Sequence, residues 1–143
     1  MNRTELQRLA AERLDDARIL FGKGKWSAAY YLAGYAIECA LKSCVLKHLD
    51  TTGFIFKDRD GLKGLEKKYW IHDLEGLVGL AGLVADFGAA RGNNPVLESY
   101  WAATKDWDEL SRYEERTEPQ ARDLLEAIGH DQDGVLKWLQ SRW

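Results

Sequence analysis

The sequence of 143 residues has little cysteine and little proline, and each shortage excludes a class of protein. Its two prolines argue against an all-β fold and against a chain rich in linkers. Its two cysteines, Cys39 and Cys44, lie five residues apart in one predicted helix, so they point in different directions and cannot form a bridge. No CxxC motif occurs either. The cysteine pattern is typical of a reducing compartment, and we expect the protein to be cytoplasmic.

Long apolar runs and a positive net charge are also missing. The longest stretch without a charged side chain covers residues 26–37, which is too short to span a bilayer. Residues 1–16 are charged throughout, so we predict no signal peptide and no membrane partner. Acidic residues outnumber Lys and Arg by 23 to 20, which argues against a protein that holds nucleic acid by a broad positive field.

The motifs of common nucleotide and metal sites are absent. Neither GxxxxGK[ST] nor GxGxxG occurs, so a nucleotide would be held by side chains between helices and not by a glycine-rich loop. The three histidines, His48, His72 and His130, are too few for a metal-dependent phosphohydrolase, and Cys44 with His48 makes only half of a zinc site. We therefore expect no metal and no cofactor.

Helical periodicity is present along most of the chain. Apolar side chains recur every three or four residues, and no segment alternates with the period of two that a strand requires. We predict an all-α fold, an antiparallel bundle of four to five helices in one domain that spans residues 1–143. The predicted helices begin near Thr4, Ser27, His72-Asp73, Asn94-Pro95 and Thr117, and Gly129 with Gly134 is expected to bend or break the last one. We expect capping boxes of Thr4 with Gln7 and of Thr117 with Gln120, and Asn94 as the cap of the helix that starts at Pro95.

The second predicted helix is apolar nearly all round, which is typical of the centre of a bundle. Tyr31, Tyr35, Glu38 and Lys42 share one of its faces, and Glu38 precedes Lys42 by the four residues that favour an ion pair. Charged side chains in a central helix need partners or a cleft. The pair is therefore either a structural ion pair or the border of a ligand site, in which Glu38 could hold an arginine such as Arg112.

Residues 28–42 read AAYYLAGYAIECALK. This string resembles the central helix of the HEPN domains (higher eukaryotes and prokaryotes nucleotide-binding), in particular of their small stand-alone bacterial and archaeal type. Further similarity lies in residues 14–20 with Gly22 and Trp26, in His72-Asp73-Leu74, and in Trp107 with Arg112-Tyr113. The resemblance implies a helical bundle that is commonly a homodimer.

The resemblance also implies two kinds of activity. Many members are metal-independent ribonucleases, in which an arginine is followed by a histidine roughly four to six residues later and two such pairs meet at the dimer interface. Others bind RNA or nucleotides without cleaving them, and many small members pair with a nucleotidyltransferase-like protein in toxin–antitoxin loci. Arg112 matches the position of the arginine, but no histidine follows it within the required window. Arg122 and His130, eight residues apart, are a displaced alternative.

Two hypotheses follow. The first is an RNA- or nucleotide-binding domain, or a metal-independent ribonuclease with a degenerate Arg…His motif, in which arginine binds phosphate and histidine would move protons. The second is a non-catalytic dimeric subunit that binds or neutralises a nucleotidyltransferase-like partner. For the first hypothesis the catalytic candidates are Arg112, Arg116 and Glu38, and the RNA- or nucleotide-binding candidates are Lys42, Tyr113, Lys67 and Lys68.

Each candidate also has a purely structural interpretation. Arg112 and Arg116 can pair with nearby glutamates at the surface. His72 can be a junction residue beside Asp73, which would cap the following helix. The basic run in residues 57–68, the best local candidate for contact with phosphate, can be a solvated loop. These alternatives stay open at the level of sequence.

Overall fold

The computed structural model describes residues 2–51 and 72–143, and every regular element in these two ranges is helical. The elements are α1 (Arg3–Gly22), α2 (Trp26–Thr51), α4 (Leu74–Leu80), α5 (Val84–Asn93), α6 (Pro95–Thr104), the 3₁₀ helix η1 (Glu109–Tyr113), α7 (Glu118–Gly129) and α8 (Val135–Gln140). The predicted all-α class is confirmed. Within the described ranges, no helix has both the length and the apolar character needed to cross a membrane.

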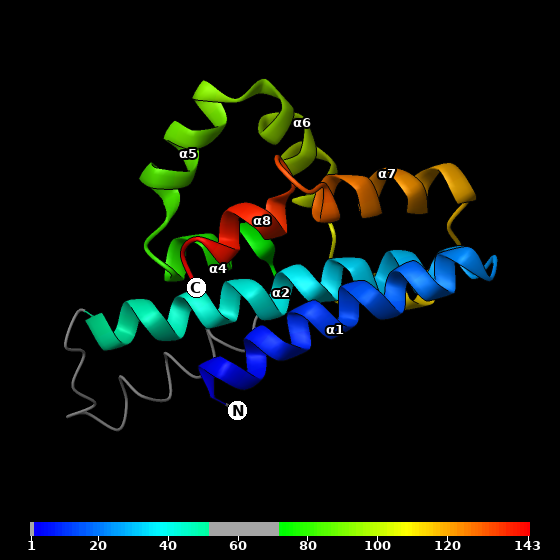
Figure 1. The fold of residues 1–143 in the computed structure, drawn as a ribbon, viewed down its shortest axis with the longest axis horizontal. Coiled ribbons are helices and arrows are strands. Elements are labelled where there is room, and N and C mark those ends of the chain that lie inside the picture. Colours follow the sequence, from blue (N-terminus) through cyan, green and yellow to red (C-terminus); the bar gives the residue numbers. More distant parts are fainter. Residues whose placement is uncertain (1, 52–71) are drawn as a thin grey trace.

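The two longest helices, α1 and α2, are antiparallel neighbours, and α7 and α8 lie along them end to end (Figure 1). α7 and α8 run in the same direction as α2. At one end the Arg116 amide donates to Ser27 Oγ, 2.8 Å away, and further along Cys44 Sγ lies 3.9 Å from the Leu139 carbonyl oxygen. The predicted antiparallel arrangement therefore does not hold throughout, because the chain returns through α4–α6 and η1 to the start of α2 before α7 begins.

α2 is the central helix, as predicted. The small side chains along it are buried, which lets the neighbouring helices approach closely. α1 covers it with a matching apolar stripe and contributes four buried side chains, Leu6, Ala10, Leu14 and Ala17. Glu38 and Lys42 are buried among these apolar groups, so any site that uses them extends into the core.

The predicted count of four to five helices is wrong, because the described ranges contain seven α-helices. The segment expected to form a third helix is divided between α4 and α5 at Gly82, whose φ of +69° lies in the left-handed region that favours glycine. A Cβ at Gly82 would also lie 2.5 Å from Cε1 of His48, so the chain can turn here only without a side chain. The predicted break between Gly129 and Gly134 is confirmed and separates α7 from α8.

The helix caps confirm two predictions and correct one. Asn94 accepts hydrogen bonds from the amides of residues 96 and 97 and so caps α6, and Thr117 forms the expected capping box at the start of α7. At the N-terminus, however, Asn2 and not Thr4 is the cap, since Asn2 with Glu5 forms the capping box. Caps of this kind contribute about 1 kcal/mol each.

Gly34 gives a testable measure of how tightly the core is packed. A Cβ at this position in α2 would lie 2.2 Å from Trp107 Nε1 and 2.3 Å from Trp107 Cδ2. We expect Gly34→Ala to lower the free energy of unfolding by about 1–3 kcal/mol in urea denaturation, because overpacking displaces the buried indole. Gly88→Ala in α5 is the matched control, since its nearest neighbour is 4.0 Å away; it should stabilise by up to about 1 kcal/mol. Equal stability of both variants would show that Trp107 is free to move.

Candidate functional site

The starting point of the site is an ion pair inside the helical core. On α2, Lys42 Nζ donates to Glu38 Oε1 at 2.8 Å, and the two side chains are only 7% and 3% exposed. Glu38 Oε2 is buried and has no hydrogen-bond partner within the described ranges. Moving each of the two charges out of water costs several kcal/mol, so stabilisation of the fold is a weak explanation for the pair. A buried ion pair with this desolvation cost marks a candidate functional site.

His72 connects this buried pair to the surface. Its Nδ1 lies 3.0 Å from Glu38 Oε1 and its Nε2 lies 2.9 Å from Glu109 Oε2. Each ring nitrogen thus lies at hydrogen-bond distance from a carboxylate oxygen, so the imidazole is held between Glu38 and Glu109. Asp73 caps α4 by accepting from the Glu75 amide, as the structural interpretation required. His72, however, does more than join two segments, because it contacts the most buried carboxylate of the described chain.

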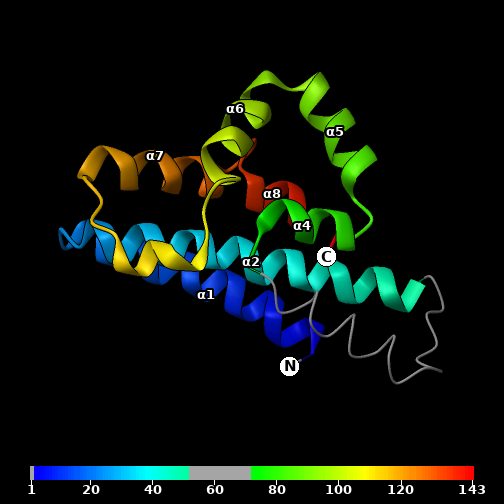
Figure 2. The ribbon, with the colours of Figure 1, turned by 180° about the vertical axis from the view of Figure 1, so that it is seen from behind.

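Arg112 stands at the outer edge of the same cluster. Its NH2 lies 3.9 Å from Glu109 Oε2, one turn earlier in η1, and its guanidinium lies 5.0 Å above the Tyr113 ring. Both η1 and α4 pack against α2 (Figure 2). The structure thus places Lys42, Glu38, His72, Glu109 and Arg112 in one continuous chain of charges. The suggested contact between Glu38 and Arg112 is not formed in the described ranges, because His72 and Glu109 lie between the two side chains.

The remaining predicted residues lie elsewhere. Arg116 pairs with Glu114 and stacks 4.3 Å above the Tyr30 ring, so it belongs to the junction of α2 and α7, as its structural interpretation required. Tyr113 is 75% exposed beside Arg112. Lys67 and Lys68, with the basic run that contains them, lie outside the described residues.

The hollow beside His72 is acidic, which the sequence analysis did not predict. It measures about 590 Å³ and lies between the start of α4 and the segment that leads into η1. Trp107 and Leu110 line it together with Lys105 and five carboxylates, those of Asp73, Glu75, Asp106, Asp108 and Glu109. Two of these carboxylates are engaged as helix caps, Asp73 on α4 and Asp108 on η1. The rest set a negative potential, and Lys105 is the one lysine or arginine among the lining residues that the structure describes.

The alternative pair, Arg122 and His130, is engaged in local structure. Arg122 pairs with Glu118 one turn earlier in α7. His130 Nδ1 accepts from the amides of Gln132 and Asp133, at 3.3 Å and 3.0 Å, and so shapes the turn before α8. His130 Nδ1 is thus bound by backbone amides of the turn, whereas His72 Nδ1 contacts the buried carboxylate of Glu38.

The chemistry available to the cluster is proton transfer next to a bound anion. A carboxylate on Nδ1 fixes the orientation of an imidazole and leaves Nε2 to exchange a proton, and a guanidinium matches phosphate oxygens in pairs. Within residues 2–51 and 72–143, no group of His, Cys, Asp and Glu side chains is arranged to hold a metal ion.

The two cysteines are inert groups of the core. Burial raises the pKa of Cys39 and of Cys44 from 9.0 to about 11, which leaves little thiolate at neutral pH. We expect the folded protein to resist iodoacetamide at pH 8, followed by mass spectrometry, and to react at both sites in denaturant. Because the unfolded thiols lose their protons near pH 9, stability should also fall as the pH rises from about 9 to 11. Rapid labelling of the native protein would contradict this placement.

Comparison of the chain with protein-family models, with curated proteins and with solved structures gave no match.

Proposed function

We propose that the chain is a HEPN-like domain that binds RNA and cleaves it without a metal, with His72 as the proton-transfer group and Arg112 as the phosphate-binding group. One observation carries the proposal. A single carboxylate, Glu109, lies 2.9 Å from His72 Nε2 and 3.9 Å from Arg112 NH2, so a histidine and an arginine forty residues apart meet at one anion. This supplies in space the histidine that is missing after Arg112 in the sequence.

In the proposed reaction Glu109 gives way to a phosphodiester of the RNA backbone. His72 acts in its neutral form, with the Nδ1–H held by Glu38, and its unprotonated Nε2 takes the proton of the 2′-OH as the 2′ oxygen attacks the phosphorus. Arg112 binds the phosphate oxygens and stabilises the negative charge that develops on them. The imidazolium then returns its proton to the departing 5′ oxygen, which yields a 2′,3′-cyclic phosphate and a 5′-hydroxyl end.

Glu109 and the acidic hollow restrict the substrate. A phosphodiester must displace the Glu109 carboxylate, and the neighbouring carboxylates repel any further phosphate that enters the hollow. The proposed site therefore fits one phosphate of an unpaired segment better than it fits the backbone of a long duplex. Replacing Glu109 by glutamine removes the competing charge and is expected to increase RNA affinity.

The experiment is a cleavage assay on cellular RNA with EDTA present. Arg112→Ala should abolish cleavage, and Arg13→Ala is the matched control, because Arg13 also pairs with an acidic residue three positions away on a helix. The products should carry 2′,3′-cyclic phosphate ends. Cleavage that survives Arg112→Ala, or that stops when EDTA is added, would refute the proposal.

A second candidate function rests on a different observation. On η1 the side chains of Leu110 and Tyr113, on either side of Arg112, are 56% and 75% exposed, and large exposed apolar groups beside an arginine are typical of a protein interface. Under this alternative the domain is a non-catalytic dimeric subunit, and η1 contacts a nucleotidyltransferase-like protein or a second copy.

A single pair of measurements separates the two functions. If the domain is only a binding subunit, the purified protein leaves RNA intact and neither retards RNA nor binds nucleotides, while Leu110→Asp disrupts its dimer or its complex. If the domain is a ribonuclease, His72 and Arg112 variants lose cleavage without a change in oligomeric state.

A further inference from the structure

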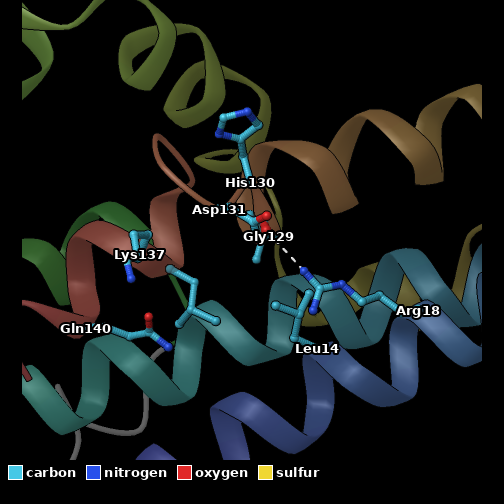
Figure 3. A pocket seen from close by; sticks show the side chains of 9 residues that line it. Leu14, Arg18, Gly129, His130, Asp131, Lys137 and Gln140 are labelled. Carbon is cyan, nitrogen blue, oxygen red and sulfur yellow. Dashed lines mark hydrogen bonds between the residues drawn. The ribbon is translucent and has the colours of Figure 1, made fainter.

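A second hollow, which shares no residue with the one beside His72, lies between the end of α7, α8, and Leu14 and Arg18 of α1 (Figure 3). It measures about 190 Å³, less than the ~300 Å³ at which pockets for drug-sized ligands begin. Its size fits a single small group. The side chains around it are mostly polar, with Leu14, Ile128 and Leu136 at its base.

Arg18 is held in place on one side of this hollow. Its NH2 donates to the Gly129 carbonyl oxygen at 3.1 Å, across the end of α7. A Cβ at Gly129 would lie only 2.6 Å from that nitrogen, so glycine here is what lets the guanidinium lie against the chain. A guanidinium has five N–H donors, and Arg18 keeps donors for a further acceptor after this bond and its 3.7 Å contact with Asp15.

α8 contributes donors from the opposite side. Lys137 and Gln140 are three residues apart and share a helix face, and Lys137 forms no ion pair with any residue in the described ranges. Figure 3 shows Arg18 on one side and Lys137 and Gln140 on the other, with the His130 ring turned away. That ring lies 5.5 Å from the Tyr100 ring instead. Asp131 is the one carboxylate among the lining residues that the structure describes.

Another hollow adjoins this one. It measures about 390 Å³, shares Arg18, Gly129 and His130 with it, and is also lined by Phe21 and Leu125. Arg122 and Glu126 also line it, and their charges are opposite. A ligand that spans both hollows would present an anion to Arg18 and a flat or apolar group to Phe21.

We propose that these two hollows bind a phosphate monoester. The phosphate oxygens accept from Arg18, Lys137 and the Gln140 amide, and the organic group lies over Phe21 and Leu125. A phosphate monoester fits because the two cations, Arg18 and Lys137, outnumber the one lining carboxylate, Asp131. A guanidinium and an ammonium are also the side chains that bind phosphate most strongly. The proposal does not depend on the function of His72 and Arg112.

Phenyl phosphate and inorganic phosphate are the probes, titrated into the full chain by NMR and calorimetry. Phenyl phosphate should bind at millimolar concentrations and shift the amides of residues 129–131, and inorganic phosphate should bind less tightly because it leaves Phe21 uncovered. Lys137→Ala and Arg18→Ala should each weaken binding by about tenfold, the loss expected for one charge-assisted hydrogen bond. Gly129→Ala, which keeps every charge but displaces the guanidinium, should weaken binding as well.

Arg8→Ala is the control, because Arg8 is an exposed arginine ten residues earlier in α1 that pairs with Glu12. It should leave binding unchanged. The proposal is overturned if phenyl phosphate shifts no amide near Gly129, or if the Arg18 and Lys137 variants bind as tightly as the Arg8 variant. Loss of RNA cleavage has no bearing on this outcome, since none of these residues lies near His72.

Discussion

His72→Ala is expected to lower the rate of RNA cleavage by about 10²–10⁴-fold, the usual contribution of a general acid–base group. The effect should be this large because the His72 ring is held by a buried carboxylate, with Nδ1 3.0 Å from Glu38 Oε1. The measurement is cleavage of a short labelled RNA in EDTA at saturating substrate.

Added imidazole distinguishes a chemical role of His72 from a structural one. The His72 side chain is 34% exposed, so a cavity left by alanine is open to small molecules. Imidazole should restore part of the lost rate in His72→Ala and should have no effect on Arg112→Ala. A variant that cleaves at the original rate would contradict the proton-transfer role. Loss of the circular-dichroism spectrum together with activity would show that His72 supports the fold instead.

Lys42→Ala is expected to lower the free energy of unfolding by about 3 kcal/mol, because the buried Glu38 carboxylate loses its ammonium partner and keeps, within the described ranges, only its contact with His72. Lys42 Nζ is 2.8 Å from Glu38 Oε1, and Glu38 is only 3% exposed, so water cannot replace the lost ammonium. The measurement is urea denaturation. Lys23→Ala, at the exposed end of α1, is the control and should change stability by no more than about 0.5 kcal/mol.

The double variant Glu38→Leu with Lys42→Met separates stability from function. Replacing a buried ion pair by apolar groups of similar volume is often neutral or stabilising, so this variant should be as stable as the original protein. It should nevertheless lose RNA cleavage, because nothing then orients the His72 ring. If the double variant is stable and fully active, the buried pair is only a structural ion pair between helices.

Much of the fold could be predicted because local chemistry determines it. The Asn94-Pro95 and Thr117 caps and the apolar character of α2 are encoded in neighbouring residues, and the structure confirms them. The number of helices and the direction of α7 could not be predicted from neighbouring residues. The division between α4 and α5 depends on the approach of His48 to Gly82, and the direction of α7 depends on a bond between Arg116 and Ser27. Both are contacts between segments far apart in the sequence.

Contacts between distant segments limit the prediction of the candidate site even more than the prediction of the fold. Periodicity was enough to pair Glu38 with Lys42, because a helix fixes which side chains face each other. It could not reveal that His72 would reach Glu38 across thirty-four residues, or that Glu109 would lie between His72 and Arg112. The one signal was His72 itself, placed directly before a helix cap and a run of leucines.

The central claim is that His72 and Arg112 act together on one phosphate, and a double-mutant cycle on RNA cleavage tests it most directly. The rates of His72→Ala, Arg112→Ala and the double variant are measured in EDTA against the original protein. Residues that act as a unit show strongly non-additive losses, so the double variant should be no slower than the slower single variant. Losses that multiply, or an original protein that leaves every RNA uncut, would contradict the claim.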